Sequence, residues 1–224
     1  MIDRRSFLGA FALPLFCGEN KTLFNGVSNQ GWRAVAGSDF PSNCWTVSDG
    51  CLKSLVAKPA FQDIRTVEEF ADFDLEFEWK ISPGGNSGVK YLIYKEDRWR
   101  PAGSTEFHAR GRGFEFQISD DGAEPDALAH PESRCGALYG LIPPARNASK
   151  PVGEFNTAHI TRRGPAVEHW INGVRVVSAQ LDNPDLGERM RVRKIPLEFP
   201  KRSPIVLQNH GSEAWFRNLR IRPY

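Results

Sequence analysis

Residues 73–81 read Phe73-Asp74-Leu75-Glu76-Phe77-Glu78-Trp79-Lys80-Ile81, and apolar and charged side chains alternate at every position. Successive side chains of an extended chain point to opposite faces, so the apolar residues of this stretch share one face and the charged residues share the other. A period of two that is sustained over the whole stretch predicts a β-strand with one buried face.

The same pattern recurs along the rest of the chain. Residues 114–118 alternate in the same way, and Asn172-Gly173 stands between two apolar runs, which is the strongest short signal for a β-hairpin. Further strand pairs are expected around Asp49-Gly50 and Gly211-Ser212, whereas no stretch carries a sustained helical period. Strands with one apolar face need two sheets packed face to face or a closed barrel. The number of strands favours an all-β fold, a two-sheet antiparallel β-sandwich.

The composition is that of an ordinary soluble globular chain. Its 224 residues suit one good-sized domain, and 29 basic against 27 acidic residues give a formal net charge of +2. This balance gives no electrostatic case for nucleic acid, and no apolar run reaches the ~18 residues of a membrane span. The polar stretch 181–202 is expected to be a solvated loop, because its basic residues are interspersed with acidic ones.

Residues 1–20 have the order of an export signal. Arg4-Arg5 precede the short apolar stretch 10–16, and this order resembles a twin-arginine signal. Cys17 would be a lipid anchor only if the three residues before it served as a lipobox, which they match poorly. We therefore expect an exported chain, periplasmic or extracellular, with a single mature domain over 21–224.

Three cysteines remain in this mature domain. Cys44, Cys51 and Cys135 cannot all pair with one another, although disulfides would persist outside the cytoplasm. No Cys-x-x-Cys occurs, so neither a zinc ribbon nor a redox motif is indicated. At least one of the three is expected to be a buried free thiol.

Specific motifs follow one another over about residues 23–223. They are Leu23-Phe24-Asn25-Gly26, Gly31-Trp32, Trp45-x-Val47-x-Asp49-Gly50, Gly84-Gly85-Asn86-Ser87-Gly88-Val89-Lys90-Tyr91, Gly113-Phe114-Glu115-Phe116-Gln117, Gly136-Ala137-Leu138-Tyr139-Gly140, Glu168-His169-Trp170-Ile171-Asn172-Gly173, Leu207-Gln208-Asn209-His210-Gly211 and Phe216-Arg217-Asn218. In order and spacing these motifs resemble the 3-keto-disaccharide hydrolase family, also known as DUF1080. The resemblance implies a concanavalin A-like jelly roll, two curved sheets with a concave face.

The resemblance further implies cleavage of glycosides that are already oxidised at C3 of a glucose ring. A ketone at C3 acidifies the proton on C2, so a base can remove this proton and the C1 leaving group can depart by elimination. Addition of water then completes a net hydrolysis. Such a site needs a base, stabilisation of the enolate oxygen and an acid for the leaving group. A divalent metal ion could hold the C2 and C3 oxygens as a Lewis acid.

A non-catalytic carbohydrate-binding module is the alternative function, because lectin-like sandwiches host binding proteins as readily as enzymes. Exposed aromatic platforms such as Trp99 and Trp215 would favour binding of an oxidised di- or oligosaccharide without cleavage. A compact cluster of polar side chains would favour catalysis.

Strand parity selects the first candidate residues. If Phe114, Phe116 and Ile118 face the core, Glu115 and Gln117 face the open side of their sheet. The same parity places Gln208 and His210 on the open side of the segment 204–210. Glu115 is the expected base or metal-binding carboxylate and His210 the expected acid/base or ligand. Gln117 and Gln208 are expected to hydrogen-bond the sugar.

Motif positions add five further candidates. Asp120 follows the Glu115 strand and is a candidate catalytic residue, although capping of a turn is an equally good reading. Asn86, in a glycine-rich loop, and Glu154, Asn156 and Arg217 are candidate substrate-binding residues. A salt bridge between strands would also explain Arg217. His169 is interpreted differently, as a packed, hydrogen-bonded histidine of the core.

Three polar positions depart from the family pattern. The form that we compare has His where Glu124 stands and Asp where Gly140 and Asn209 stand. If any of these positions belongs to a proton relay or metal site, a different substrate or a binding-only function becomes the better expectation.

Overall fold

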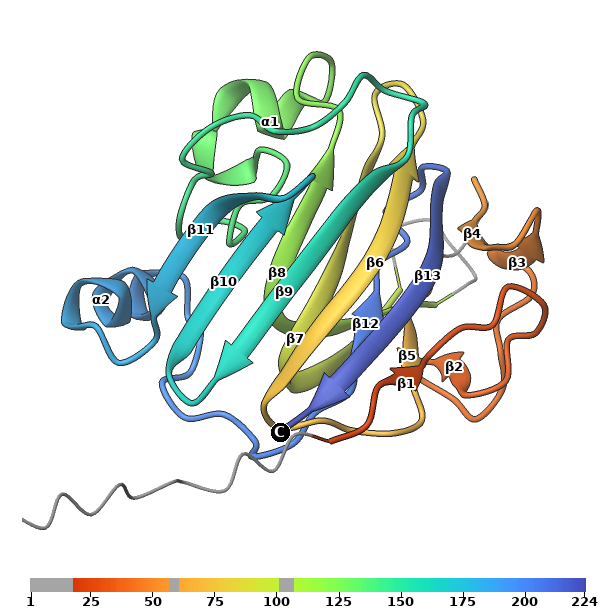
Figure 1. Ribbon diagram of the computed structural model, residues 1–224, viewed down its shortest axis with the longest axis horizontal. Helices are drawn as coiled ribbons and strands as arrows, with labels where there is room; N and C mark the ends of the chain where they lie inside the picture. The colour runs from red at the N-terminus through yellow and green to blue at the C-terminus, as the bar shows by residue number, and fades with distance from the viewer. Residues whose placement is uncertain (1–17, 57–60, 101–106) are drawn as a thin grey trace, which may run out of the picture.

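The computed structural model describes residues 18–56, 61–100 and 107–224. The expected export signal and Cys17 lie almost wholly outside this part of the chain. Two sheets pack face to face, with the larger sheet toward the viewer in Figure 1. The predicted all-β sandwich is therefore confirmed. No helix of the described residues is long and apolar enough to cross a membrane.

The larger sheet has eight antiparallel strands. In spatial order they are β11 (Val174–Gln180), β10 (Ala166–Ile171), β9 (Asn156–Arg163), β6 (Phe73–Ile81), β13 (Ala214–Pro223), β4 (Cys51–Ser54) and β3 (Trp45–Ser48), with β1 (Lys21–Thr22) paired to β13. The alternating stretch 73–81 forms β6, which lies in the middle of this sheet. The hairpin predicted at Asp49-Gly50 joins β3 to β4.

The smaller sheet has five strands and lies behind the larger one in Figure 1. In spatial order they are β2 (Trp32–Ala34), β5 (Ile64–Thr66), β12 (Val206–Leu207), β7 (Asn86–Trp99) and β8 (His108–Ser119). The long β7–β8 hairpin carries a register shift between Tyr91 and Lys95, where Leu92 has a φ of 50°. This irregularity changes which side chains of β8 face outward beyond it.

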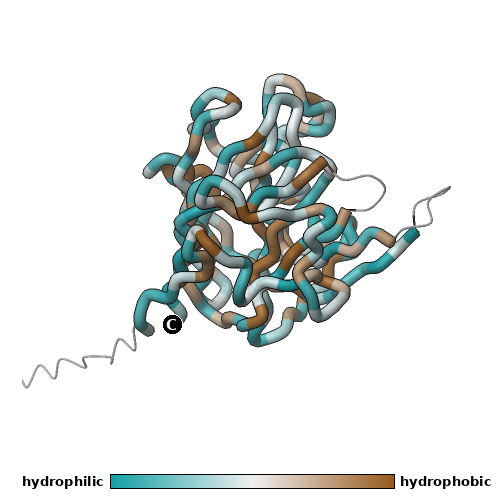
Figure 2. The backbone as a smooth tube through the Cα atoms, turned by 90° about the vertical axis from the view of Figure 1, so that its right-hand side faces the viewer, coloured by the Kyte–Doolittle hydropathy of each residue, from teal (hydrophilic) through white to brown (hydrophobic). Residues whose placement is uncertain are grey.

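The core fills the space between the sheets, where Figure 2 shows the apolar segments gathered. All five apolar residues of β6 are at most 2% exposed, and Phe77 meets Phe116 of β8 edge to face at 5.6 Å between ring centroids. Aromatic pairs of this geometry stabilise a core beyond the area that they bury. The alternation of β6 and β8 thus gives each sheet one face buried in the core and one outer face.

His169 lies inside this core, as predicted. Its Nε2 is 2.8 Å from the Tyr91 hydroxyl and its Nδ1 is 3.0 Å from the Gly136 carbonyl oxygen. Next to the β10–β11 bulge between His169 and Trp170, His169 pairs with Val177. Burial lowers the pKa of His169 from 6.5 to about 4.

A buried neutral histidine makes the stability of the fold depend on pH. Its folded-state pKa lies below the unfolded value, so its contribution is complete above pH 6.5 and is lost as the pH falls toward 4. We expect about 3 kcal/mol of unfolding free energy to disappear over this interval. Urea unfolding of His169→Gln between pH 4 and 7 should show a shallower loss. The exposed-histidine variant His130→Gln should keep the steep loss, and equal slopes in all three proteins would contradict the assignment.

In the described part of the chain, two short helices and a 3-10 turn lie outside the sheets: α1 (Pro125–Ala129), η1 (Pro131–Ser133) and α2 (Pro184–Val192). The expectation that 181–202 is only a loop is wrong for α2. The Asn183 side chain accepts hydrogen bonds from Asp185 N and Leu186 N, and Pro184 is at the first turn. Only Leu186 and Met190 are buried, which is too few apolar residues for a visible helical period.

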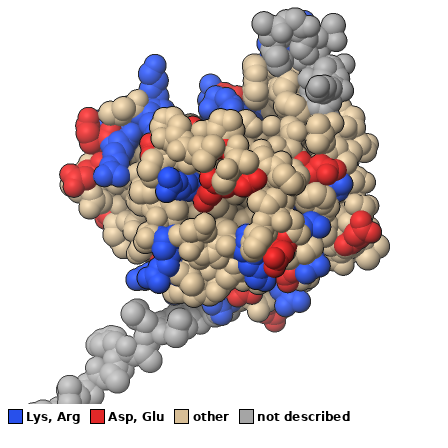
Figure 3. All heavy atoms as spheres, turned by 90° about the horizontal axis from the view of Figure 1, so that it is seen from above, with Lys and Arg blue, Asp and Glu red and all other residues tan. Residues whose placement is uncertain are grey.

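Charges are mixed on the surface. Seen from above in Figure 3, acidic and basic side chains are interspersed without a field of one sign. The near balance of charges in the sequence is therefore also a local balance on this face, which gives a polyanion such as nucleic acid no continuous basic path.

Candidate functional site

Polar side chains gather in a cavity of about 180 Å³ on the outer face of the smaller sheet. Strands β7 and β8 and the segment after β12 supply its floor, and residues around Tyr139 and Arg193 supply its wall. The side chains that carry the chemistry are Asn86, Lys90, Glu115, Gln117, Gln208 and His210. Five of the nine predicted site residues thus lie in one cavity, and Lys90 joins them.

Strand register explains why these residues meet. Lys90 of β7 stands opposite Glu115 of β8, and Val206 of β12 stands opposite Lys90 on the other side. The backbone N–H of Gln208 donates to the Gly88 carbonyl, which brings Gln208 beside the pair. A Cβ at Gly88 would lie 2.8 Å from Cδ of Glu115, so the glycine gives the Glu115 carboxylate room above β7.

Three charged side chains are buried together on this floor. Lys90, Asp63 and Glu115 are 3%, 1% and 9% exposed. Lys90 Nζ lies 2.9 Å from Asp63 Oδ2 and 3.8 Å from Glu115 Oε2. Asp63 also accepts from the backbone N–H groups of Gly111 and Asn209, at 3.2 and 3.1 Å. Asp63 is therefore the fixed counter-charge of Lys90, and Glu115 is the carboxylate that faces the cavity.

Burial sets the proton affinity of Glu115. Loss of hydration raises its pKa from 4.5 to about 7, against the charge of Lys90, which lowers it. A carboxylate with this pKa can take a proton near neutral pH and release it again, which is what a general base needs.

Amide side chains surround the carboxylate. In the orientation that satisfies both of its hydrogen bonds, the Gln208 oxygen accepts from Lys90 Nζ at 3.0 Å and its nitrogen donates to Glu115 Oε1 at 3.3 Å. Gln117 Nε2 donates to Asn86 Oδ1 at 3.3 Å. The other amide atom, Gln117 Oε1, is buried and has no hydrogen-bond partner among the described residues. It is an acceptor that a sugar hydroxyl would satisfy.

His210 stands at the mouth of the cavity. Desolvation and the nearby charge of Lys90 lower its pKa, so the imidazole is neutral at pH 7. A neutral imidazole can accept a proton from water or from a sugar hydroxyl.

Four predicted residues lie elsewhere. Asp120 accepts from Gly84 N at 2.8 Å and Gly122 N at 3.1 Å and so caps a turn. Asn156 is buried on the larger sheet, where its Oδ1 accepts from Lys150 N and Asn172 Nδ2. Arg217, on the same sheet, forms a 2.7 Å ion pair with Glu78. Glu154 is exposed in the loop before β9. None of the four lines this cavity, and we leave them out of the site.

The three departures have structural explanations. Glu124 caps α1 by accepting from Ala127 N at 2.8 Å, and it also accepts from Asn86 Nδ2 at 3.2 Å. Asn209 is buried and donates from Nδ2 to the Cys44 carbonyl at 2.9 Å. Gly140 has a φ of 67°, and a Cβ there would lie 2.8 Å from Nη2 of Arg193. Glu124 thus holds Asn86 beside the cavity, Gly140 leaves room for Arg193, and Asn209 ties the segment after β12 to the loop before β3.

The donor set does not form a metal centre. Among residues 18–56, 61–100 and 107–224, no group of three or more His, Cys, Asp and Glu side chains could hold a metal ion. The two carboxylates nearest the cavity, Asp63 and Glu115, flank an ammonium group instead. We therefore derive no step through a metal ion.

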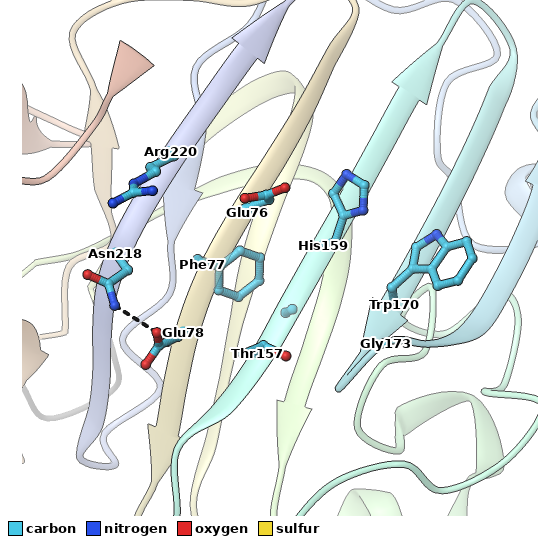
Figure 4. Close-up of a pocket in the computed structure, with 10 residues that line it drawn as sticks. Glu76, Phe77, Glu78, Thr157, His159, Trp170, Gly173, Asn218 and Arg220 are labelled. Atoms are coloured by element: carbon cyan, nitrogen blue, oxygen red, sulfur yellow. Dashed lines mark hydrogen bonds between the residues drawn. The ribbon is translucent and has the colours of Figure 1, made fainter. Parts of the chain in front are cut away.

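A second hollow of about 400 Å³ lies on the outer face of the larger sheet (Figure 4). Glu76, Glu78, His159 and Trp170 lie along its floor. Partial burial would raise the pKa of Glu78, but hydrogen bonds from Asn218 and Arg217 lower it overall. This carboxylate therefore stays ionised at neutral pH, unlike that of Glu115.

The aromatic platforms expected for a binding module are occupied. Trp99 packs against the ring of His108, with centroids 5.2 Å apart, and against the guanidinium of Arg110. Trp215 lies on the larger sheet, with the ammonium groups of Lys53 and Lys80 over its ring. Neither tryptophan offers a bare ring face to the cavity around Glu115.

Comparison with known proteins agrees with this fold. Residues 19–222 match the family model described as the 3-keto-alpha-glucoside-1,2-lyase-like domain. The chain is 30% identical over 238 residues to a 3-keto-disaccharide hydrolase of Bacteroides thetaiotaomicron, covering 96% of this chain and 82% of that protein. Two crystal structures of candidate glycosyl hydrolases from Parabacteroides distasonis have TM-scores of 0.72 and 0.69, at 27% and 25% identity. The matches cover 92% of this chain and 94% and 100% of theirs.

Proposed function

The chain belongs to the family of 3-keto-α-glucoside-1,2-lyase-like domains, and from this premise we propose that it cleaves the glycosidic bond of 3-keto-glycosides by elimination followed by hydration. The observation that carries the proposal is the Glu115 carboxylate, buried beside the Lys90–Asp63 ion pair on the floor of a cavity. Glycoside cleavage by ordinary hydrolases uses two carboxyl groups across the scissile bond. This cavity offers one carboxylate and one ammonium group, which suits removal of an acidic C–H proton.

The proposed reaction begins at C2. Glu115 takes the C2 proton, and the electron pair of the C–H bond moves toward the C3 carbonyl oxygen. Lys90 and Gln208, both in contact with the Glu115 carboxylate, stabilise the negative charge that develops on this oxygen. The pair then returns to form the C1–C2 double bond as the C1–O bond breaks.

The second half of the reaction returns the proton and adds water. The carboxyl group of Glu115 gives its proton to the departing oxygen. Neutral His210, at the mouth of the cavity, accepts a proton from the water that attacks C1. The proton that His210 takes from this water then passes to C2 and restores the ketone, so atoms and protons balance as a net hydrolysis.

Deuterium exchange tests this sequence directly. The protein should release the aglycone from an aryl 3-keto-glucoside and leave the parent aryl glucoside intact, because only the ketone acidifies C2. In D₂O, NMR of the sugar product should show deuterium at C2. Cleavage of the parent glucoside at a similar rate, or a product without deuterium at C2, would overturn the proposal.

The pH dependence of the reaction follows from Glu115. Since its pKa is about 7 and the base must be ionised, kcat/KM should fall about tenfold per pH unit below this value. The pKa of His210 is lowered by desolvation and the Lys90 charge, and a histidine that acts as a base adds no alkaline limb. Initial rates from pH 5 to 9 would show the limb, whereas a flat profile down to pH 5 would remove Glu115 as the base.

A further inference from the structure

Basic side chains dominate the lining of the catalytic cavity. Lys90, Arg110, Arg112 and Arg193 line it, against Glu115 alone among acidic residues. Two of these cations are neutralised from behind: Lys90 by Asp63 and Arg112 by Asp97. Among the described residues, Arg110 and Arg193 have no carboxylate this close to their guanidinium groups.

Arg110 has no carboxylate partner within the described parts of the chain. Its guanidinium lies 4.6 Å from the Trp99 ring centroid, and its Nε is buried with no hydrogen-bond partner there. Desolvation and the neighbouring Arg112 charge lower its pKa, against the charges of Asp63, Asp97 and Glu115.

Arg193 lies beside Tyr139 in the wall of the cavity. It caps the C-terminus of α2, and its guanidinium lies 6.0 Å from the Tyr139 ring centroid. Gly140 leaves the space that the guanidinium fills, since any Cβ there would collide with Nη1 and Nη2. Its nearest carboxylate oxygen, Glu132 Oε1, is 4.0 Å away, at the limit of an ion pair.

The support of Arg193 is rigid. Leu186 and Met190 bury one face of α2, and Arg189 Nη1 donates to the Leu141 carbonyl at 3.0 Å. The backbone N–H of Arg193 donates to the Arg189 carbonyl at 3.2 Å. The backbone of Arg193 is thereby fixed, and a planar guanidinium loses less freedom per hydrogen bond than an ammonium group does.

We infer that the cavity prefers 3-keto-glycosides whose leaving group carries a negative charge, and that Arg193 at the wall, aided by Arg110, binds this charge. The guanidinium fork matches the two oxygens of a carboxylate or a sulfonate, and the partly desolvated wall strengthens the contact. The inference rests on the proposed function, because it assumes that the keto ring lies over Glu115 with the leaving group toward the mouth.

The test uses aryl 3-keto-glucosides that differ only in one ring substituent: carboxylate, sulfonate or neutral carboxamide. We expect kcat/KM for the carboxylate to exceed that for the carboxamide by about ten- to a hundredfold, the range of a charge-assisted hydrogen bond. The difference should reside in KM and should shrink with added salt. A sulfonate that matches the carboxylate would identify general anion recognition, and a weaker sulfonate would identify carboxylate recognition; both support the inference.

Variants separate a binding role for Arg193 from a structural one. Arg193→Gln should abolish the preference, and Arg193→Lys should restore part of it. Arg191→Gln, on the same helix and paired with Glu188 at 2.9 Å, is the matched control and should keep the preference. Equal kcat/KM for the charged and neutral substrates in the wild type, or a preference that survives Arg193→Gln, would overturn the inference.

Binding measured without turnover keeps this inference apart from the proposed function. Calorimetry of Glu115→Gln with the carboxylate and carboxamide parent glucosides should show tighter binding of the carboxylate. If the wild type turned over none of the keto substrates but this difference remained, the reaction would be wrong and the anion site right. If turnover occurred without any difference in binding, the reverse would hold.

Discussion

Glu115→Gln is expected to lower kcat for a 3-keto-glucoside by about 10²- to 10⁴-fold, the contribution of a positioned general base. The amide has nearly the same shape and can keep the contact with Gln208, but it cannot accept the C2 proton. KM should change little, because the carboxylate acts on the proton rather than on the bound ring. Stopped-flow or steady-state release of a chromogenic aglycone measures the loss.

The same substitution has a second signature. Because the buried carboxylate is held above its usual pKa at a cost to the folded state, Glu115→Gln should be as stable as the wild type or more stable at pH 9. Glu78→Gln, which alters an ion-paired carboxylate on the other sheet, is the matched control and should retain full turnover. Retention of more than about a tenth of wild-type kcat in Glu115→Gln would exclude Glu115 as the base.

Lys90→Met is expected to cost about 3–5 kcal/mol of unfolding free energy, because it leaves the Asp63 carboxylate buried without its counter-charge. It should also reduce kcat, since the ammonium group that stabilises the enolate oxygen is gone. In the protein that remains folded, the acid limb of the pH profile should move to higher pH, because the Lys90 charge lowers the pKa of Glu115.

A double-mutant cycle separates the two effects. Asp63→Asn removes the charge but keeps one side-chain oxygen and the shape of the side chain. Combining it with Lys90→Met should therefore recover stability but not kcat. Lys80→Met, on the half-exposed outer face of β6, is the control and should cost less than about 1 kcal/mol. Recovery of both stability and turnover in the double variant would show that Lys90 is only a structural partner of Asp63.

Short-range periodicity predicts the two sheets and half of the site. The alternation around Phe116 fixes which way Glu115 and Gln117 point, and this orientation depends only on the backbone geometry of one strand. Gln208 follows the same parity although β12 is only two residues long, because its N–H continues the ladder onto Gly88.

Long-range packing decides the rest. Lys90 sits in an apolar run, Ser87 to Ile93, where its burial depends on Asp63, 27 residues earlier in the chain. A lone polar residue in such a run is a signal that could have marked it. Helix α2 brings Arg193 to the cavity. The two buried apolar residues of this helix are too few to show a helical period in the sequence. Asp120 and Arg217 belong to strong motifs, but the turn and the sheet that they stabilise lie away from the cavity.

The three described cysteines can report when the folded protein opens, because their thiols are buried. Cys44, Cys51 and Cys135 are unpaired, and each is at most 2% exposed. Burial raises the pKa of Cys44 to about 11 and that of Cys135 to about 12, so almost no thiolate is available to an electrophile in the closed state. A thiol reagent therefore labels Cys44 and Cys135, which belong to the core between the sheets, only when this core opens. One thiol lies in the loop before β3, one on β4 and one beside η1. Mass spectrometry of the labelled peptides would therefore measure how fast each of these regions opens.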